Sequence, residues 1–211
     1  MMNFGKAFTF IFDDERWFDK LIVPILVSLI PIVGPLALSG YVIRTIKNVI
    51  ENENDPLPEF QFGEDLGRGF RYFLIGLVYG LPIMLVIGIM MIPLLALNNN
   101  ESISALGIIV LIFGGLLLFV YGFFLMLIQP ISMANFAMKD TFASGFELGN
   151  FFKRLGKNFP AWLLVLAGML IASIISPMGS IVFGIGAFVT IAYSQLMVAH
   201  LTGQAYVASD N

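Results

Sequence analysis

The chain has 211 residues, of which 58% are hydrophobic and 12% are charged, and its mean hydropathy is +0.91. Soluble domains carry about 25% charged residues, and half that density cannot cover a folded domain of this size in water. The composition excludes a soluble enzyme and a disordered chain, and it indicates an integral membrane protein. The lack of Cys, the single His and the net charge of −3 exclude a disulfide framework, a His-rich metal centre and a basic surface for nucleic acid.

The N-terminal residues 1–20 combine aromatic side chains at near-helical spacing with the acidic residues Asp13, Asp14, Glu15 and Asp19. This pattern predicts an amphipathic helix in the membrane interface. It is not typical of a signal peptide, in which a positive region directly precedes the apolar run.

The first apolar run, Leu21–Ile43, has 23 residues without a charge. Pro31, Gly34 and Pro35 interrupt it, and basic residues on both sides favour the cytoplasmic face for both ends. We therefore predict a broken, re-entrant hairpin at 21–48, with one kinked span as the alternative. Because lipid cannot satisfy irregular backbone, the tip is expected to be enclosed by the other spans or by a neighbouring subunit.

Four further apolar segments are predicted to be transmembrane helices, at 72–97, 103–129, 159–176 and 180–200. They are joined by a loop with a short interfacial helix at 49–71, a polar turn at 98–102 and a second interfacial helix at 130–158, and they are followed by a tail at 201–211. Pro130 is expected to end the second of these spans. All eleven Lys and Arg side chains lie in segments that this threading assigns to one side, so we predict a cytoplasmic C-terminus.

The predicted spans contain no Asp, Glu, Lys or Arg in their cores. Ion-coupled transporters usually place such residues there, so the sequence argues against proton-coupled or metal-dependent transport. We recognise no catalytic constellation and expect neither enzymatic activity nor a cofactor.

Uncharged polar residues do occur within or beside the apolar segments. They are expected either to form hydrogen bonds between helices or to line a path for a lipid head group or a polar solute. These residues are Ser28, Ser39, Tyr41, Tyr79, Gln129, Asn135, Ser173, Ser176, Thr190, Tyr193, Ser194 and Gln195.

Small residues form a second pattern within the spans. Gly76 and Gly80 make a GxxxG motif, and Gly184 and Gly186 add to the small-residue surface. This pattern predicts close helix–helix packing, either within the chain or between copies of it.

Several short motifs resemble one known family. They are Trp17 with Lys20, the run 29–34, Gly40-Tyr41 with Arg44, Leu57-Pro58-Glu59, Gly67-x-Gly69-Phe70 and the ending 199–206. Together they resemble the membrane family called domain of unknown function 4013, which is found in archaea and bacteria. The resemblance implies a prokaryotic inner membrane and supplies no catalytic residues. Our candidates for the hairpin tip or for contacts with lipid or a partner are Pro31, Gly34, Pro35, Gly40, Tyr41 and Arg44.

The expected fold class is thus all-α, a polytopic helical membrane bundle with a broken first hairpin and four full spans. The expected function is to bind membrane lipids, further copies of the chain or other membrane proteins, in a scaffold, assembly or membrane-organising role. The alternative is a translocator of lipid or another apolar solute, since discontinuous helices often mark transporter sites.

Overall fold

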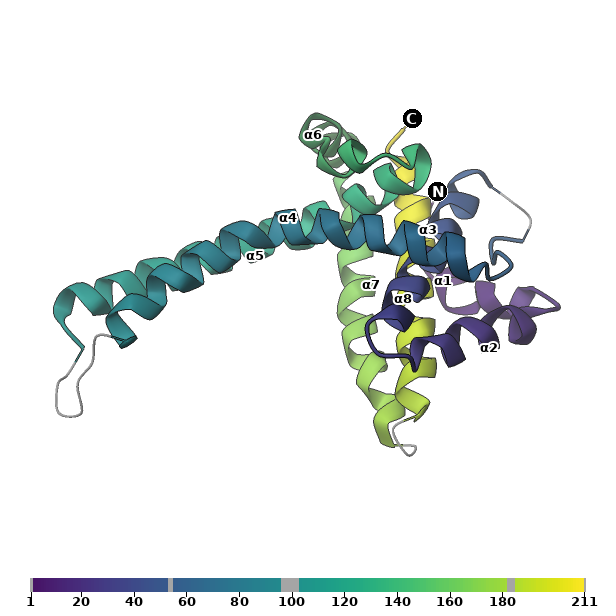
Figure 1. Cartoon of the computed structure of the whole chain (residues 1–211). Coiled ribbons are helices and arrows are strands. Elements are labelled where there is room, and N and C mark those ends of the chain that lie inside the picture. Colours follow the sequence, from purple (N-terminus) through teal and green to yellow (C-terminus); the bar gives the residue numbers. More distant parts are fainter. Residues whose placement is uncertain (1, 53–54, 96–102, 182–184, 211) are drawn as a thin grey trace.

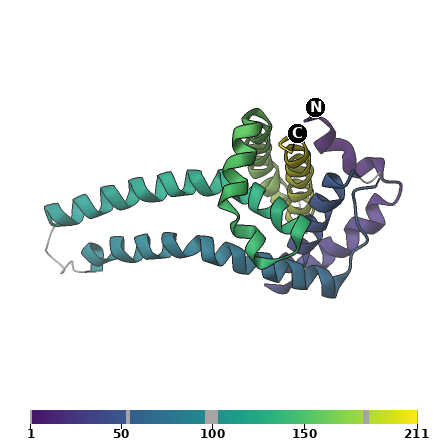
Figure 2. The same cartoon turned by 90° about the horizontal axis from the view of Figure 1, so that it is seen from above.

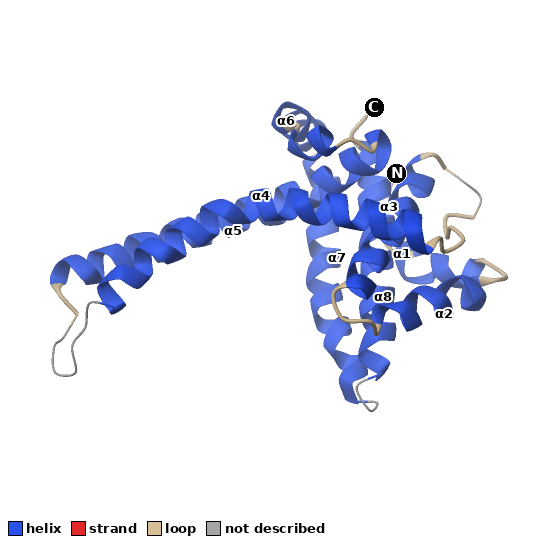
Figure 3. Cartoon of the chain, viewed as in Figure 1, coloured by secondary structure: helices blue, strands red, loops and turns tan. Residues whose placement is uncertain are grey.

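The computed structural model describes residues 2–52, 55–95, 103–181 and 185–210. All regular elements in these ranges are helical (Figure 3), which confirms the all-α prediction. The elements are α1 (Lys6–Thr9), η1 (Phe10–Asp13), α2 (Trp17–Ser28), α3 (Val33–Ile50), α4 (Phe62–Leu95), α5 (Ala105–Lys139), η2 (Phe142–Phe146), α6 (Leu148–Lys157), α7 (Phe159–Met178), η3 (Gly179–Ile181) and α8 (Ile185–Ala208), where η denotes a 3-10 helix.

Helix α3 is the centre of the body and packs against α2, α4 and α8. Its crossing with α4 brings the two backbones into contact at two glycines. A Cβ on Gly40 would lie 1.8 Å from the Asp65 carbonyl oxygen, and a Cβ on Gly69 would lie 1.8 Å from the Leu36 carbonyl oxygen. Glycine is therefore required at both positions if the helices are to approach this closely.

The first apolar run folds as two helices, and the break between Ser28 and Val33 falls beside Pro31, close to the predicted tip. Ile32 has a φ of 67°, and the Val33 N–H donates to the Pro31 carbonyl at 2.7 Å. This is a γ-turn in a conformation that is strained for a β-branched residue. Because Ile32 is 79% exposed, the other spans of this chain do not enclose the tip, and enclosure by a neighbouring subunit stays a prediction.

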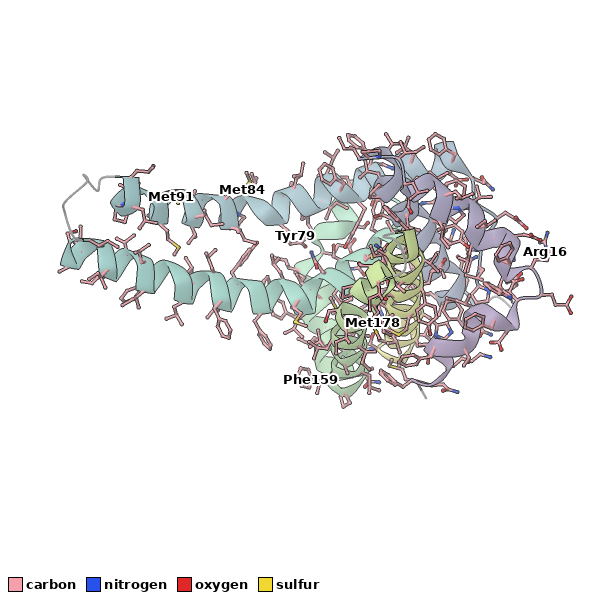
Figure 4. The ribbon with its side chains drawn as sticks, turned by 90° about the horizontal axis from the view of Figure 1, so that it is seen from below. Arg16, Tyr79, Met84, Met91, Phe159 and Met178 are labelled. Carbon is pink, nitrogen blue, oxygen red and sulfur yellow. The ribbon has the colours of Figure 1, made fainter. Side chains whose placement is uncertain are left out.

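Helices α4 and α5 extend from the body as a long hairpin (Figures 1 and 2). We call its distal part, residues 80–95 and 105–120, the arm. The two helices meet there at Gly114, where a Cβ would lie only 2.4 Å from Met90 Cγ. Most large apolar side chains of the arm are exposed. Met84 points away from α5 (Figure 4).

Helix α5 continues through Pro130 to Lys139, so the predictions that Pro130 ends it and that 130–158 forms one interfacial helix are wrong. Proline in a helix interior costs about 3 kcal/mol. Beyond it, however, Ile131 and Phe136 are fully buried, and each buried side chain of this kind stabilises by about 1.5–3 kcal/mol. Tertiary packing thus outweighs the local penalty. The remainder of 130–158 forms η2 and α6.

Three other boundaries differ from prediction for similar reasons. Residues 64–72 belong to α4, which already begins at Phe62. Residues 1–20 form α1, η1 and the start of α2 instead of one amphipathic helix. Residues 201–208 continue α8, where Leu201 and Ala205 are fully buried. In each case packing against the body decides where the helix begins, ends or breaks, and the local sequence pattern alone does not determine this.

Helices α7 and α8 form an antiparallel hairpin that runs across the direction of the arm (Figure 1). Helix α7 ends at Met178, within the break predicted at 176–179, but η3 continues the helical path to Ile181 and α8 begins at Ile185 instead of residue 180. Among the described residues, three helical segments are long and apolar enough to cross a membrane: Phe62–Leu95, Ala105–Lys139 and Phe159–Ile181. The predicted polar turn at 98–102 lies outside the described residues.

Candidate functional site

The main cavity lies where α3, α4, α5, α7 and α8 meet, and its volume is about 590 Å³. We call it the five-helix cavity. Its polar side chains are all uncharged and come from every one of these helices. They are Ser39, Tyr72, Gln129, Ser173, Ser176, Ser194, Gln195 and Thr202. The apolar remainder of the lining includes Val42, Met133, Met169, Ala172 and Val198.

The serines of the cavity differ in how their hydroxyls are satisfied. Ser39 donates to the Pro35 carbonyl at 2.9 Å, and Ser173 donates to the Leu170 carbonyl at 2.7 Å. Ser194 is 1% exposed, and its Oγ has no hydrogen-bond partner among the described residues. A buried hydroxyl without a partner is unfavourable, so the Ser194 Oγ is available for a hydrogen bond with a polar atom that enters the cavity.

One side of the cavity is accessible from outside the molecule. Gln129 of α5 and Ser173 of α7 line it and are exposed, whereas Ser194 and Thr202 of α8 are buried. The cavity therefore has a rim between α5 and α7 and an inner wall on α8. Polar and apolar groups are mixed along it, as in sites for small amphipathic molecules.

A buried ion pair fixes α3 against α4. Arg44 of α3 donates from Nε to Asp65 Oδ1 at 2.7 Å and from Nη2 to Asp65 Oδ2 at 2.8 Å. Arg44 also donates to the Glu59 carbonyl at 2.6 Å. The Asp65 side chain is 0% exposed and that of Arg44 is 12% exposed. This bidentate geometry holds the base of the α4–α5 hairpin in place.

A second charged cluster joins the two ends of the first hairpin. Lys20 of α2 is buried, lies 2.7 Å from an oxygen of Asp14, bonds to Asp55 and donates to the Leu57 carbonyl at 2.8 Å. Burial by itself lowers the pKa of Lys20, but the contacts with Asp14 and Asp55 outweigh it and raise the pKa overall. Burial raises the pKa of Asp14, whereas contacts with Asp55, Lys20 and the Arg16 amide lower it overall.

Basic side chains also form contacts at the C-terminal ends of α5 and α8. Arg71 of α4 lies 3.0 Å from Asp140 at the end of α5. Arg154 of α6 donates to the Tyr206 carbonyl at 2.8 Å and to Asp210 at 3.0 Å, and thus satisfies the C-terminal end of α8. The start of α4 and the ends of α5 and α8 are therefore all bound by charged contacts.

The candidate contact residues from the sequence do not line the cavity. Pro31, Gly34 and Pro35 lie at or just after the turn between α2 and α3, and a Cβ on Gly34 would lie 2.3 Å from the Val27 carbonyl oxygen. Gly40 lies at the crossing with α4, Tyr41 is fully buried, and Arg44 pairs with Asp65. Their positions explain helix packing, and they do not form one site.

Of the glycines predicted to pack closely against another helix, only some do so among the described residues. A Cβ on Gly76 or Gly80 would meet nothing within 4 Å, so these residues make no close helix contact within the described chain. The Gly186 carbonyl oxygen lies 2.1 Å from the position of a Cβ on Gly179, so this part of α8 does pack closely. Gly184 lies outside the described residues.

The uncharged polar residues singled out in the sequence fall into two groups, one that forms hydrogen bonds between elements and one that lines the five-helix cavity. Some connect separate elements: Tyr79 donates to the Gly145 carbonyl at 2.7 Å, Tyr193 to the Phe8 carbonyl at 2.9 Å, and Asn135 accepts from Asn150 at 2.7 Å. Six others line the five-helix cavity: Ser39, Gln129, Ser173, Ser176, Ser194 and Gln195.

Two polar residues of the cavity were missed from the sequence. Thr202 follows Ser194 and Val198 at intervals of four, which places all three on one helix face. That spacing was a usable signal. Tyr72 stands at the predicted start of a span, and only the crossing of α4 with α5 brings it to the cavity.

Comparisons with known proteins agree with the sequence motifs. No solved structure matches the chain. An uncharacterized protein of Methanocaldococcus jannaschii is 28% identical over 163 residues, which cover 75% of this chain and 54% of that protein. The chain therefore spans about half the length of the curated relative that it matches. The model of a family described as protein of unknown function (DUF4013) matches residues 23–191. Because this match covers most of the chain, the protein belongs to that family, as its motifs predicted.

Proposed function

We propose that this protein is an integral membrane protein with a non-catalytic role, in which it binds membrane lipid and organises lipids or partner proteins around it. The observation that carries the proposal is the exposed apolar surface of the arm. Residues such as Leu81, Met84, Ile112 and Phe113 are exposed along it, and an apolar surface of this extent needs lipid or protein around it.

The lengths of the helices support insertion of the arm. Helix α4 has 34 residues and α5 has 35, which correspond to about 50 Å each. The hydrocarbon core of a bilayer is about 30 Å thick. The charged first turns of α4 and the last turns of α5 then lie outside the core, and the uncharged arm enters it. Helix α7 meets the same criterion of length and hydropathy. In this proposal α8, which has 24 residues and packs along α7, returns across the core as the fourth span.

The arm and the α7–α8 hairpin point in different directions (Figure 1). If both are to cross one flat bilayer, the arm has to turn at its base. The base is fixed where Tyr121 donates to the Tyr79 carbonyl at 2.9 Å. Gly80 and Pro82 follow at once in α4, and Pro82 removes a helix hydrogen bond. We place the turn at these two residues.

The contacts of Lys20 support a re-entrant first hairpin. A single span would separate its two ends by the thickness of the bilayer core, whereas Lys20 before the hairpin bonds to Asp55 after it. Labelling of Asn3→Cys and Asn52→Cys from the same side of the membrane would support this placement. Labelling from opposite sides would contradict it.

Native mass spectrometry of the protein released from detergent tests the proposed function. We expect retained lipid, or a defined complex with a partner protein, and no extraction of the protein from membranes by alkaline carbonate. A strict monomer that carries neither lipid nor partner would contradict the proposal.

A lipid translocator is the second candidate, and the rim of the five-helix cavity between α5 and α7 favours it. A translocator needs a site that mixes polar and apolar groups and opens sideways to lipid. Purified protein in liposomes should then move a fluorescent lipid between leaflets. Transfer no faster than in protein-free liposomes would exclude this role.

A further inference from the structure

We propose that the five-helix cavity binds an uncharged lipid, with a hydroxyl-bearing head group held inside and a hydrocarbon chain that leaves between α5 and α7. This inference rests on the proposed function and names the class of lipid. The ligand is thus a monoacylglycerol-like or long-chain-alcohol-like molecule, and a phospholipid is not expected to fit.

The charge of the lining decides the class of head group. No charged side chain lines the cavity in the part of the chain that the structure describes. A phosphate placed there would lose part of its hydration without gaining a cationic partner, which is unfavourable. Hydroxyl groups can instead exchange neutral hydrogen bonds with serine, threonine and glutamine side chains. The cavity therefore favours a head group that is polar but uncharged.

Ser194 supplies the strongest evidence that something polar belongs inside. Its Oγ is buried and unpartnered, although Ser39 and Ser173 of the same cavity have carbonyl partners on their own helices. Serine has three staggered χ1 rotamers, which lie about 120° apart, so a change of rotamer can present the hydroxyl to a ligand. Bound ligand would satisfy an atom that is unsatisfied in the chain alone.

The apolar groups and the rim account for the hydrocarbon chain. Met133 and Met169 contribute flexible apolar surface to the lining. A volume of about 590 Å³ lies in the range of small-molecule sites, roughly 300–1,000 Å³. At the rim, Ser173 adjoins the exposed Ile174, and Leu170 is exposed one turn earlier. A chain that passes the rim would thus meet an apolar surface that continues into the surrounding lipid.

Thermal unfolding of delipidated protein in detergent tests the proposal with two matched probes. 1-Oleoylglycerol has an uncharged head with two hydroxyls, and 1-oleoyl-lysophosphatidic acid has the same chain with a phosphate. At about 100 times its Kd, 1-oleoylglycerol should raise Tm by roughly 5 °C or more. The phosphate analogue should raise Tm by less at the same concentration.

Three variants connect this effect to the cavity. Ser194→Ala should leave the Tm of the unliganded protein unchanged or higher, and it should weaken 1-oleoylglycerol binding by roughly two- to tenfold, as for loss of one neutral hydrogen bond. Ala172→Phe should fill the cavity and abolish the shift. Ser28→Ala is the control, because Ser28 is also buried but donates to the Ile25 carbonyl and does not line the cavity.

A failure of this inference can be distinguished from a failure of the proposed function. An equal or larger Tm shift with the phosphate analogue, equal binding by Ser194→Ala and the native chain, or no shift with either probe would each overturn this inference. None of them would change carbonate extraction or the lipid found by native mass spectrometry, which test the proposed function itself.

Discussion

The ion pair between Arg44 and Asp65 gives the sharpest prediction about stability. Asp65→Asn removes the carboxylate that accepts both bonds, at 2.7 and 2.8 Å, and leaves the buried Arg44 charge without its partner. Breaking a buried pair in this way costs about 3–5 kcal/mol. For a protein of about 200 residues, 1 kcal/mol shifts Tm by about 2–4 °C, so we expect a decrease of roughly 6–20 °C. Unfolding in detergent, followed by circular dichroism at 222 nm, measures it.

Glu64→Gln is the matched control, because Glu64 precedes Asp65 and its pair with Arg68 is half exposed on the carboxylate side. An exposed pair contributes about 0–1 kcal/mol. In the double variant Arg44→Met with Asp65→Asn, no buried charge is stranded, so most of the lost stability should return. Equal effects of Asp65→Asn and Glu64→Gln, or strictly additive effects in the double variant, would refute the role given to this pair.

Three further changes test other parts of the fold. The pKa of Asp14 is lowered, so its charged form stabilises the fold above the usual carboxyl pKa, and this contribution should be lost as the pH falls below about 4. Asp55 in the same cluster has a raised pKa and acts in the opposite direction. Lys20→Met removes the cation that lowers the pKa of Asp14 and should reduce the loss from Asp14; a pH scan of Tm measures the difference, and an unchanged pH profile in Lys20→Met would contradict the assignment. Gly69→Ala places a Cβ 1.8 Å from a backbone oxygen and should lower Tm strongly. Gly76→Ala places its Cβ in open space, so it should leave Tm unchanged or raise it. Similar Tm values for the two variants would contradict the α3–α4 crossing. Ile32→Gly should relieve a strain of about 1–3 kcal/mol and keep or raise Tm, and a marked decrease would show that the positive φ is not strained.

The sequence could predict the helical membrane class, because it depends on composition and on long uncharged runs. It also predicted the breaks beside Pro31 and near Pro177, where backbone donors are missing and glycine is close. It did not predict that α5 passes through Pro130, because the burial of Ile131 and Phe136 after it depends on helices far away in the chain.

The candidate site was predictable only in part. Uncharged polar residues within spans pointed to six residues of the five-helix cavity, but local pattern cannot tell which of them face a cavity and which bond to a neighbouring helix. Tyr79 and Gln129 look alike as polar positions in apolar runs, yet Tyr79 bonds to Gly145 and Gln129 lies at the rim. That division is set by the crossing of five helices. The glycines required for close packing, such as Gly40 and Gly69, likewise depend on which backbone lies opposite.

The most direct test of the account is the membrane topology of the α4–α5 hairpin. The chain contains no Cys, so single variants at position 99, in the predicted polar turn, and at position 153, on α6, can each be labelled in intact cells with a maleimide that does not cross membranes. We expect Asn99→Cys to react from outside, whereas Lys153→Cys should react only after the membrane is permeabilised. Protection of position 99 together with outside labelling of position 153, or labelling of both from one side, would contradict it.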